Sequence, residues 1–145
     1  MLALGLRWPS AAKDSSSDEL AKAFLASLSP DGRKEAQFAF EDDYRTTWNY
    51  VPIARKGASL DHMNEGQIAR ATLLLKASLS DVGYKTVEQI RGLEDVLFEL
   101  ENGNPGRNKT KYYFTFFGEP SNKGHWAGGM RGTTSRSVSP IKTAS

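Results

Sequence analysis

Two amphipathic helices are predicted near the beginning of the chain. Ser16 and Glu19 stand three residues apart, which is the spacing of a capping box, and predict a helix that continues through Leu28. Its apolar face consists of Leu20, Phe24 and Leu28. A second helix is expected to begin at Pro30, because proline lacks only an amide that the first helical turn leaves unpaired, and to end near Phe40. The residues that it turns inward are Ala36 and Phe38.

Two longer helices are predicted in the middle of the chain. Residues 62–79 repeat apolar side chains at helical spacing. One side of this helix is formed by Met63, Ile68, Thr72, Leu75 and Leu79. Thr86 and Gln89 form a second capping box, which predicts a helix through Glu101. Its inward residues are Ile90, Leu93, Leu97 and Leu100. Residues 103–106, Gly-Asn-Pro-Gly, are expected to end it as a turn.

Two segments contain the β-branched and aromatic residues that are typical of strands. Residues 46–51 favour an extended segment, which Pro52 and Gly57 close. Residues 111–117 have the strongest strand signal, and we expect the two segments to pair, because a single strand cannot bury itself. Bulky side chains on both faces favour core packing for Tyr112–Phe117. The predicted fold class is α+β, with a helix-rich N-terminal portion and two or more strands.

The end of the chain differs from the rest in charge. The whole chain carries +2, and residues 127–145 carry +3 from Arg131, Arg136 and Lys142 with no acidic residue, so residues 1–126 carry −1. Positive charge concentrated in a tail rather than on a folded face argues against nucleic-acid binding. We expect residues 1–17 to form a flexible lead, residues 18–126 a partial α+β domain, and residues 127–145 a disordered tail.

Composition limits the classes of function further. Hydrophobic residues make up 39% and charged residues 25% of the 145 residues, which is the range of a globular protein. No apolar run is long enough to span a membrane, and Met1–Arg7 lacks the charged lead and the long apolar stretch of a secretory signal. We therefore expect a soluble protein whose compartment is open. Because cysteine is absent, thiol nucleophiles, disulfides and thiolate metal sites are excluded.

Few side chains have the character of a functional site. His62 and His125 are the only imidazoles, and the chain lacks a nucleophile elbow, a Walker loop, an EF-hand and a His-Glu-x-x-His motif. No catalytic, cofactor-binding or metal-ligating residue is therefore assigned, and no partner is named. Glu94 follows the predicted core residue Leu93 and is expected to be partly buried. Its expected partner is Arg45, Arg55 or Arg91. The candidate polar residues, functional or structural, are Arg45, Arg55, Glu94 and His125.

Several segments together resemble the family catalogued as domain of unknown function 3500. The segments that carry the resemblance are Phe24–Pro30, Arg45–Pro52, Arg55–Gly57, Met63, Gln67, Leu79–Ser80, Gly83–Tyr84, Leu93–Leu97, Tyr112–Ser121 and Trp126. They cover about residues 18–126 in consistent order. The resemblance implies that a complete member is more than twice as long as this chain, and it implies no activity.

The family pattern diverges from this chain after Trp126. The family continues Gly-Trp-Arg-aromatic-Glu-Gly-His-His-Leu-Ser-Leu, whereas residues 127–137 here read Ala-Gly-Gly-Met-Arg-Gly-Thr-Thr-Ser-Arg-Ser. When these residues are back-translated with permitted third bases and read from the final base of the Trp126 codon, the family motif appears. We interpret this agreement as a frameshift near Trp126. A natural linker rich in Gly, Ser and Thr is the alternative.

Three functional interpretations stay open at this point. The chain is interpreted first as an inactive fragment of a family without an assigned function. The second interpretation is a His-dependent enzyme, with or without a metal, whose catalytic Glu-Gly-His-His element is missing here. The third is a non-catalytic binding or scaffold module in which Trp48, Tyr50 and the strand Tyr112–Phe117 present an aromatic surface to a polymer or a protein. Burial of that strand on both faces would remove the surface that the third interpretation needs.

Overall fold

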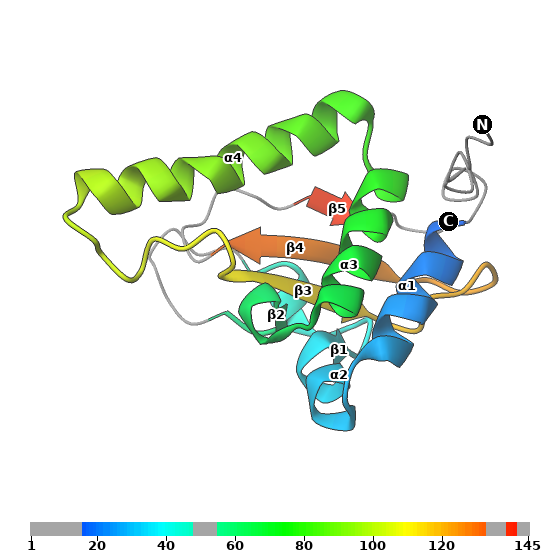
Figure 1. Cartoon of the computed structure of the whole chain (residues 1–145). Coiled ribbons are helices and arrows are strands. Elements are labelled where there is room, and N and C mark those ends of the chain that lie inside the picture. The colour runs from blue at the N-terminus through cyan, green and yellow to red at the C-terminus, as the bar shows by residue number, and fades with distance from the viewer. Residues whose placement is uncertain (1–15, 48–54, 133–138, 142–145) are drawn as a thin grey trace, which may run out of the picture.

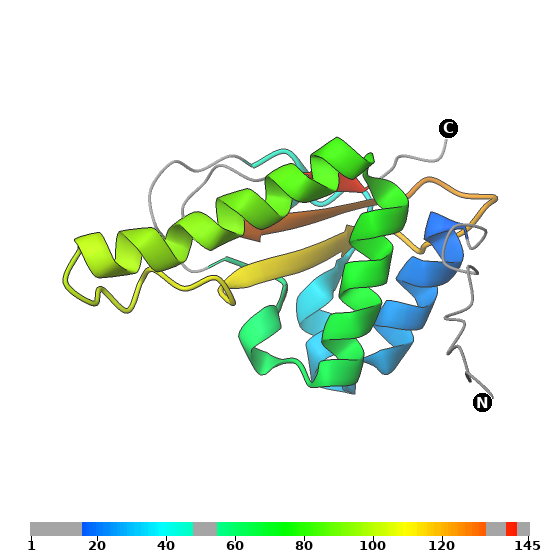
Figure 2. The same cartoon turned by 45° about the horizontal axis from the view of Figure 1, so that its top comes forward.

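The computed structural model describes residues 16–47, 55–132 and 139–141. Within these residues, four α-helices stand against a mixed sheet (Figure 1). The helices α1 (Ser17–Ser27) and α3 (Glu65–Ser78) lie across one face of this sheet. The long helix α4 (Asp81–Leu100) extends past the end of the sheet in both views (Figures 1 and 2). The predicted α+β class is confirmed.

The strand β3 (Tyr112–Phe117) is the centre of the sheet. Along one edge it pairs antiparallel with β4 (Ala127–Gly132) over the full length of both strands. Two short strands share its other edge: β1 (Gln37–Phe38) runs parallel to β3, and β2 (Ala58–Ser59) runs antiparallel to it. The strand β5 (Ser139–Ile141) continues the sheet beyond β4. This shared edge brings the helix that precedes β1 into contact with β2.

The starts of the two N-terminal helices agree with the sequence prediction. The Ser16 hydroxyl accepts a hydrogen bond from the Glu19 N–H at 3.3 Å and caps α1. The Ser29 hydroxyl accepts one from the Gly32 N–H at 3.1 Å and caps α2 (Pro30–Ala36). The side of α1 toward the sheet carries the buried Ala21, Phe24 and Leu25. Local capping therefore sets where both helices begin.

The predicted end of the second helix near Phe40 is wrong. α2 ends at Ala36, and the next two residues leave it as β1. The Gln37 side-chain amide donates to the Gly118 carbonyl oxygen at 3.0 Å, and the Gly118 N–H donates to the Phe38 carbonyl oxygen at 2.9 Å. Pairing with a distant strand thus outweighs the local helical tendency.

The two longer helices also begin at capping residues, and one predicted cap is wrong. Asn64 and Gln67 form a reciprocal capping box that opens α3. Ser80 caps α4, six residues before the predicted cap Thr86. The Thr86 hydroxyl instead donates to the Val82 carbonyl oxygen at 2.8 Å, as a threonine inside a helix does.

The predicted inward faces of these helices are only partly correct. α3 buries Ala71, Leu74 and Leu75, while the predicted Ile68 is exposed. α4 buries Val87 and Glu94, while the predicted Leu93 and Leu100 are exposed. Since α4 extends past the sheet, only one narrow side of it meets the body of the molecule. The predicted Ile90 and Leu97 are half-buried, so the apolar stripe found from the sequence is only partly turned toward the body.

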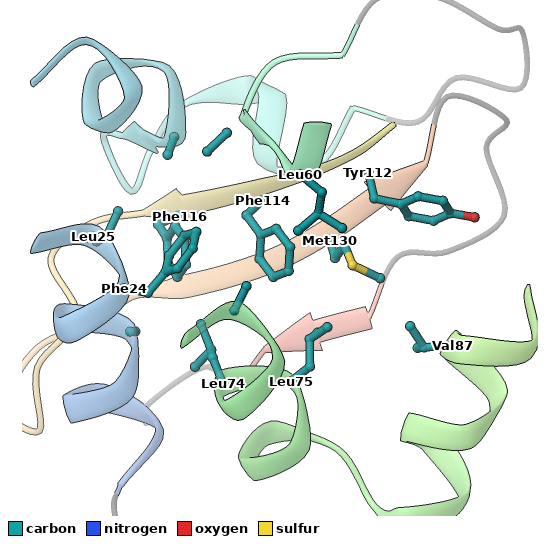
Figure 3. Packing of buried hydrophobic residues seen from close by; sticks show 14 of the residues in the cluster. Phe24, Leu25, Leu60, Leu74, Leu75, Val87, Tyr112, Phe114, Phe116 and Met130 are labelled. Atoms are coloured by element: carbon teal, nitrogen blue, oxygen red, sulfur yellow. The ribbon is translucent and has the colours of Figure 1, made fainter. Parts of the chain in front are cut away.

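The core lies between α1, α3 and the sheet, as Figure 3 shows. The Phe24 ring is 5.4 Å from the Phe114 ring and 5.7 Å from the Phe116 ring, measured between centroids. On the other face of β3, Thr115 is fully buried and Phe117 is buried. The prediction that this strand packs into the core is confirmed. Burial on both faces removes the part of the aromatic binding surface that this strand would form, while Trp48 and Tyr50, the other part of that interpretation, lie outside the described residues.

The predicted boundary of the packed region at residue 126 is also wrong. β4 begins at Ala127, directly after the buried Trp126, and its Met130 side chain is fully buried in the core. Three glycines and an alanine among these six residues hide the strand from propensity rules, because a ladder is held by backbone hydrogen bonds. Residues 127–132, and residues 139–141 through β5, therefore belong to the sheet and not to a disordered tail.

Other predictions fall wholly or partly outside the described residues. Residues 48–51 of the predicted strand lie there, and the described Thr46 and Thr47 follow a short 3-10 helix, Asp43–Arg45, rather than joining the sheet. Residues 1–15 of the predicted lead and residues 133–138 and 142–145 of the predicted tail also lie outside. Within the described part, no helix combines the length and apolar character needed to cross a membrane.

Candidate functional site

Two adjoining hollows open beside β2, and together we call them the β2 cleft. The larger has a volume of about 410 Å³ and the smaller about 230 Å³. The residues that line both are Glu35, Ser59 and His62. The larger hollow is completed by Phe38, Arg55, Lys56, Gly57 and Tyr113. The smaller is completed by Leu28, Ser29, Asp31, Gly32, Ala58, Met63 and Gln67. Ligand sites of small molecules have volumes of this order.

The strand pairing described above builds the walls of the β2 cleft. α2 supplies Glu35 from its last turn, and β1 follows directly with Phe38. β2 supplies Ser59, and the 3-10 helix Leu60–His62 that follows it supplies the imidazole. Tyr113 reaches the cleft from β3, opposite Ser59 in the strand register. Residues distant in the sequence therefore meet here because β1 and β2 share one edge of β3.

Ser59, Asp61 and His62 form a polar cluster at the junction of the two hollows. The Ser59 hydroxyl donates a hydrogen bond to Asp61 Oδ1, and His62 Nε2 lies 3.9 Å from the same oxygen. In a Ser-His-Asp triad the imidazole stands between the hydroxyl and the carboxylate. Here the carboxylate stands in the middle, so the cluster does not have the arrangement that activates serine as a nucleophile.

Lys56 is held on the opposite wall by aromatic contacts. Its Nζ lies 5.8 Å from the centroid of the Phe38 ring and 5.3 Å from that of Tyr44. The Lys56 N–H also donates to the Tyr44 hydroxyl at 3.2 Å. Arg131 lies over the same tyrosine, with its Cζ 4.5 Å from the ring centroid. These contacts hold Lys56 beside the larger hollow, which it lines together with Arg55.

The structure places the four candidate polar residues in three separate places. Arg55 lines the larger hollow of the β2 cleft. Arg45 and His125 both approach Phe40: the Arg45 Cζ is 4.2 Å from the centroid of that ring, and the His125 ring is 6.1 Å from it. Glu94 lies buried on α4. Arg55 is thus the one candidate that the structure places in the cleft.

Glu94 belongs to a cluster that ties the end of α4 to the following loop. Its Oε2 lies 4.0 Å from Arg107 Nη1, and the expected partner Arg91 instead pairs with Glu88 at 2.8 Å. Arg107 also binds Glu101 through two of its nitrogens, at 2.8 and 3.1 Å. The hydrogen bond from Arg107 lowers the pKa of Glu101, and the same bond raises the pKa of Arg107. These contacts fasten the loop that carries Arg107 to the C-terminal half of α4.

Sequence reasoning missed Glu35, Ser59 and Asp61, and noted His62 without placing it in a site. The segment Ser59-Leu60-Asp61-His62 brings a hydroxyl, a carboxylate and an imidazole within four positions, and this was the one local signal present. Glu35 offered no signal, because it is one of many charged residues on a short helix. Among the described residues, no group of three or more His, Asp or Glu side chains is placed to hold a metal ion.

The fold and the cleft define a class of protein: an α+β domain with a charged hollow where two short strands share an edge of the central strand. The chain belongs to the family described as protein of unknown function (DUF3500), whose model matches residues 10–133. The matched range includes β4, so it extends beyond the boundary expected at residue 126. Neither a curated protein nor a solved structure matches the chain.

Proposed function

We propose that the β2 cleft binds a small zwitterionic molecule, such as an amino acid or a short peptide. The observation that carries this proposal is the opposite charge of its two ends. In the larger hollow, Arg55 and Lys56 outnumber the one carboxylate, Glu35. In the smaller hollow, Asp31 and Glu35 are the charged side chains among the described lining residues. A ligand with a carboxylate at one end and an ammonium at the other complements this arrangement.

The remaining lining residues support a ligand of mixed character. Leu28 and Met63 in the smaller hollow, and Phe38 in the larger, offer apolar surface for a hydrocarbon side chain. Ser59 and His62 stand between the two charged ends, where they can bond a polar group in the middle of the ligand. A few polar groups around apolar surface are typical of a small-molecule site.

Calorimetric titration with paired probes tests the proposal. We expect leucyl-leucine to bind the full chain more tightly than either 4-methylpentanoate or 3-methylbutylamine, because each of these analogues lacks one charge. Lys56→Met and Glu35→Gln should each weaken leucyl-leucine binding by about tenfold (~1.4 kcal/mol). Lys123→Met, at an exposed position outside the cleft, is the matched control and should leave the affinity unchanged. Equal affinity for the zwitterion and the two analogues would contradict the proposal.

We propose further that the chain has no catalytic activity by itself. The Ser59 hydroxyl is bonded to Asp61 rather than to an imidazole, which supports this proposal. A family activity that depends on the Glu-Gly-His-His element would be absent here, since residues 127–137 lack both histidines. The frameshift interpretation accounts for that difference. The nucleotide sequence that follows the Trp126 codon tests the frameshift interpretation. If the shifted reading frame lacks the two His codons, the frameshift interpretation is contradicted.

A further inference from the structure

The side of α4 that faces away from the body carries large apolar side chains. The most exposed are Val82, Leu93, Val96 and Leu100, at 74%, 56%, 50% and 73%. The opposite side carries the buried Val87 and Glu94, and Figure 3 shows Val87 pointing from α4 toward the core. Large apolar side chains exposed on one side of a helix mark a surface for association.

The exposed stripe has the spacing of a seam between two helices. Its positions alternate by four and three residues, which is the a and d pattern that packs knobs into holes. These positions, all of them exposed, are Val82, Thr86, Gln89, Leu93, Val96 and Leu100. We call them the α4 seam.

We propose that the α4 seam binds the α4 seam of a second copy of this chain. The two helices run antiparallel, and the two-fold axis crosses them at the level of Arg91. In this alignment Val82 lies opposite the partner's Leu100, Thr86 opposite the partner's Val96, and Gln89 opposite the partner's Leu93. All six positions find a counterpart, because they are symmetric about Arg91. A two-fold interface requires this kind of self-complementarity.

The charges beside the seam match the same alignment. Lys85 and Glu99 lie on one flank of α4, two heptads apart, and the antiparallel pair brings each Lys85 next to the partner's Glu99. Between them on this flank lies Gly92, where an added Cβ would meet open space. A parallel pair would instead place Lys85 near the partner's Ile90 and leave both charges unmatched. Charge complementarity therefore favours the antiparallel arrangement.

The polar side of α4 favours a second copy over a lipid surface. A helix that lies on an anionic membrane presents Lys and Arg beside its apolar face. On α4 and its C-terminal cap, the acidic residues outnumber the basic Lys85 and Arg91. These acidic residues are Asp81, Glu88, Glu94, Asp95, Glu99 and Glu101.

A charge exchange tests the interface in the full chain by sedimentation velocity. Lys85→Glu and Glu99→Lys each place like charges together twice per dimer, so each should raise the dimer dissociation constant by about tenfold. The double variant restores opposite charges and should restore the original constant. Lys22→Glu, at an exposed position on α1, is the control and should change little. Monomer at all concentrations, or a double variant as weak as the singles, would overturn the proposal.

Spin labels then test the direction of the helices. Because the chain has no cysteine, Asp81→Cys carries a single label on each copy. The proposed alignment separates the two labels by about 30 Å along the axis, at 1.5 Å per residue, whereas a parallel pair keeps them within about 10 Å. Leu93→Glu should abolish the dipolar signal while circular dichroism retains its helical content. A short label distance, or a monomer that binds phosphatidylcholine vesicles through α4, would refute the antiparallel dimer.

Discussion

Gly57 shows how one residue decides the shape of the cleft. It lies directly before β2 with φ at +129°, a conformation that residues with a Cβ rarely adopt. A Cβ at this position would lie 2.7 Å from the Phe114 carbonyl oxygen and 2.9 Å from Thr115 Cγ2. The missing side chain lets the segment that carries Arg55 and Lys56 approach β3 closely. Both cations reach the cleft wall for that reason.

We expect Gly57→Ala to destabilise the protein by about 2 kcal/mol or more, because the backbone strain and the clash with β3 add together. Urea unfolding followed by circular dichroism measures the change. Gly66→Ala is the matched control: its Cβ would meet the nearest atoms at 3.4 Å, within ordinary contact. That substitution in the first turn of α3 should change the free energy of unfolding by less than about 1 kcal/mol. Equal stabilities of the two variants would count against the strained role of Gly57.

At the scale of elements, the sequence predicted what local chemistry controls. Ser16 and Pro30 mark the true starts of the first two helices, and Tyr112–Phe117 is the central strand. The side of α4 that packs against the body could not be predicted from the sequence, because periodicity reveals an apolar face but not what that face contacts. β4 was missed for a related reason, because its glycines join the sheet through the backbone alone.

The candidate site was less accessible to sequence reasoning than the fold. Arg55 was identified, but Glu35 and Ser59 were not, because each enters the cleft through strand pairing over long sequence separations. Arg45 and His125 were grouped with it, and the structure places them around Phe40 instead. Side-chain type alone therefore identified charged residues as candidates. It did not indicate which of them come together in the folded chain.

One buried hydrogen bond joins α1 to the start of β4 and tests how these elements depend on each other. Trp126 Nε1 donates to Asp18 Oδ1 at 2.7 Å, and both side chains are buried. We expect Trp126→Phe to destabilise the protein by about 2 kcal/mol, because the Asp18 carboxylate loses its indole donor. In an Asp18→Ala background the same substitution should cost less, and a double-mutant cycle by urea unfolding measures the difference. Additive losses would show that the bond contributes nothing.

At the scale of the whole molecule, the central question is how far the fold extends along the chain. α1 and α3 cover one face of the sheet, and the core between them includes a residue from β4 as well as residues from β3. The sequence interpretation ended the packed region at residue 126, whereas the described sheet includes β4 through Gly132 and then β5 through Ile141. The boundary at residue 126 and the boundary seen in the sheet predict different effects of a core substitution after Trp126 on the free energy of unfolding.

Met130 decides between them, because it lies beyond the expected boundary and is fully buried beside Phe114 in the strand register. If β4 is part of the cooperative fold, Met130→Ala leaves a cavity and should lower the free energy of unfolding by about 2–5 kcal/mol. Met130→Leu conserves volume and should cost less than about 1.5 kcal/mol. Thermal and urea unfolding of the full chain measure both. An alanine variant as stable as the original chain would show that residues 127–132 do not contribute to the fold. The packed region would then end at Trp126.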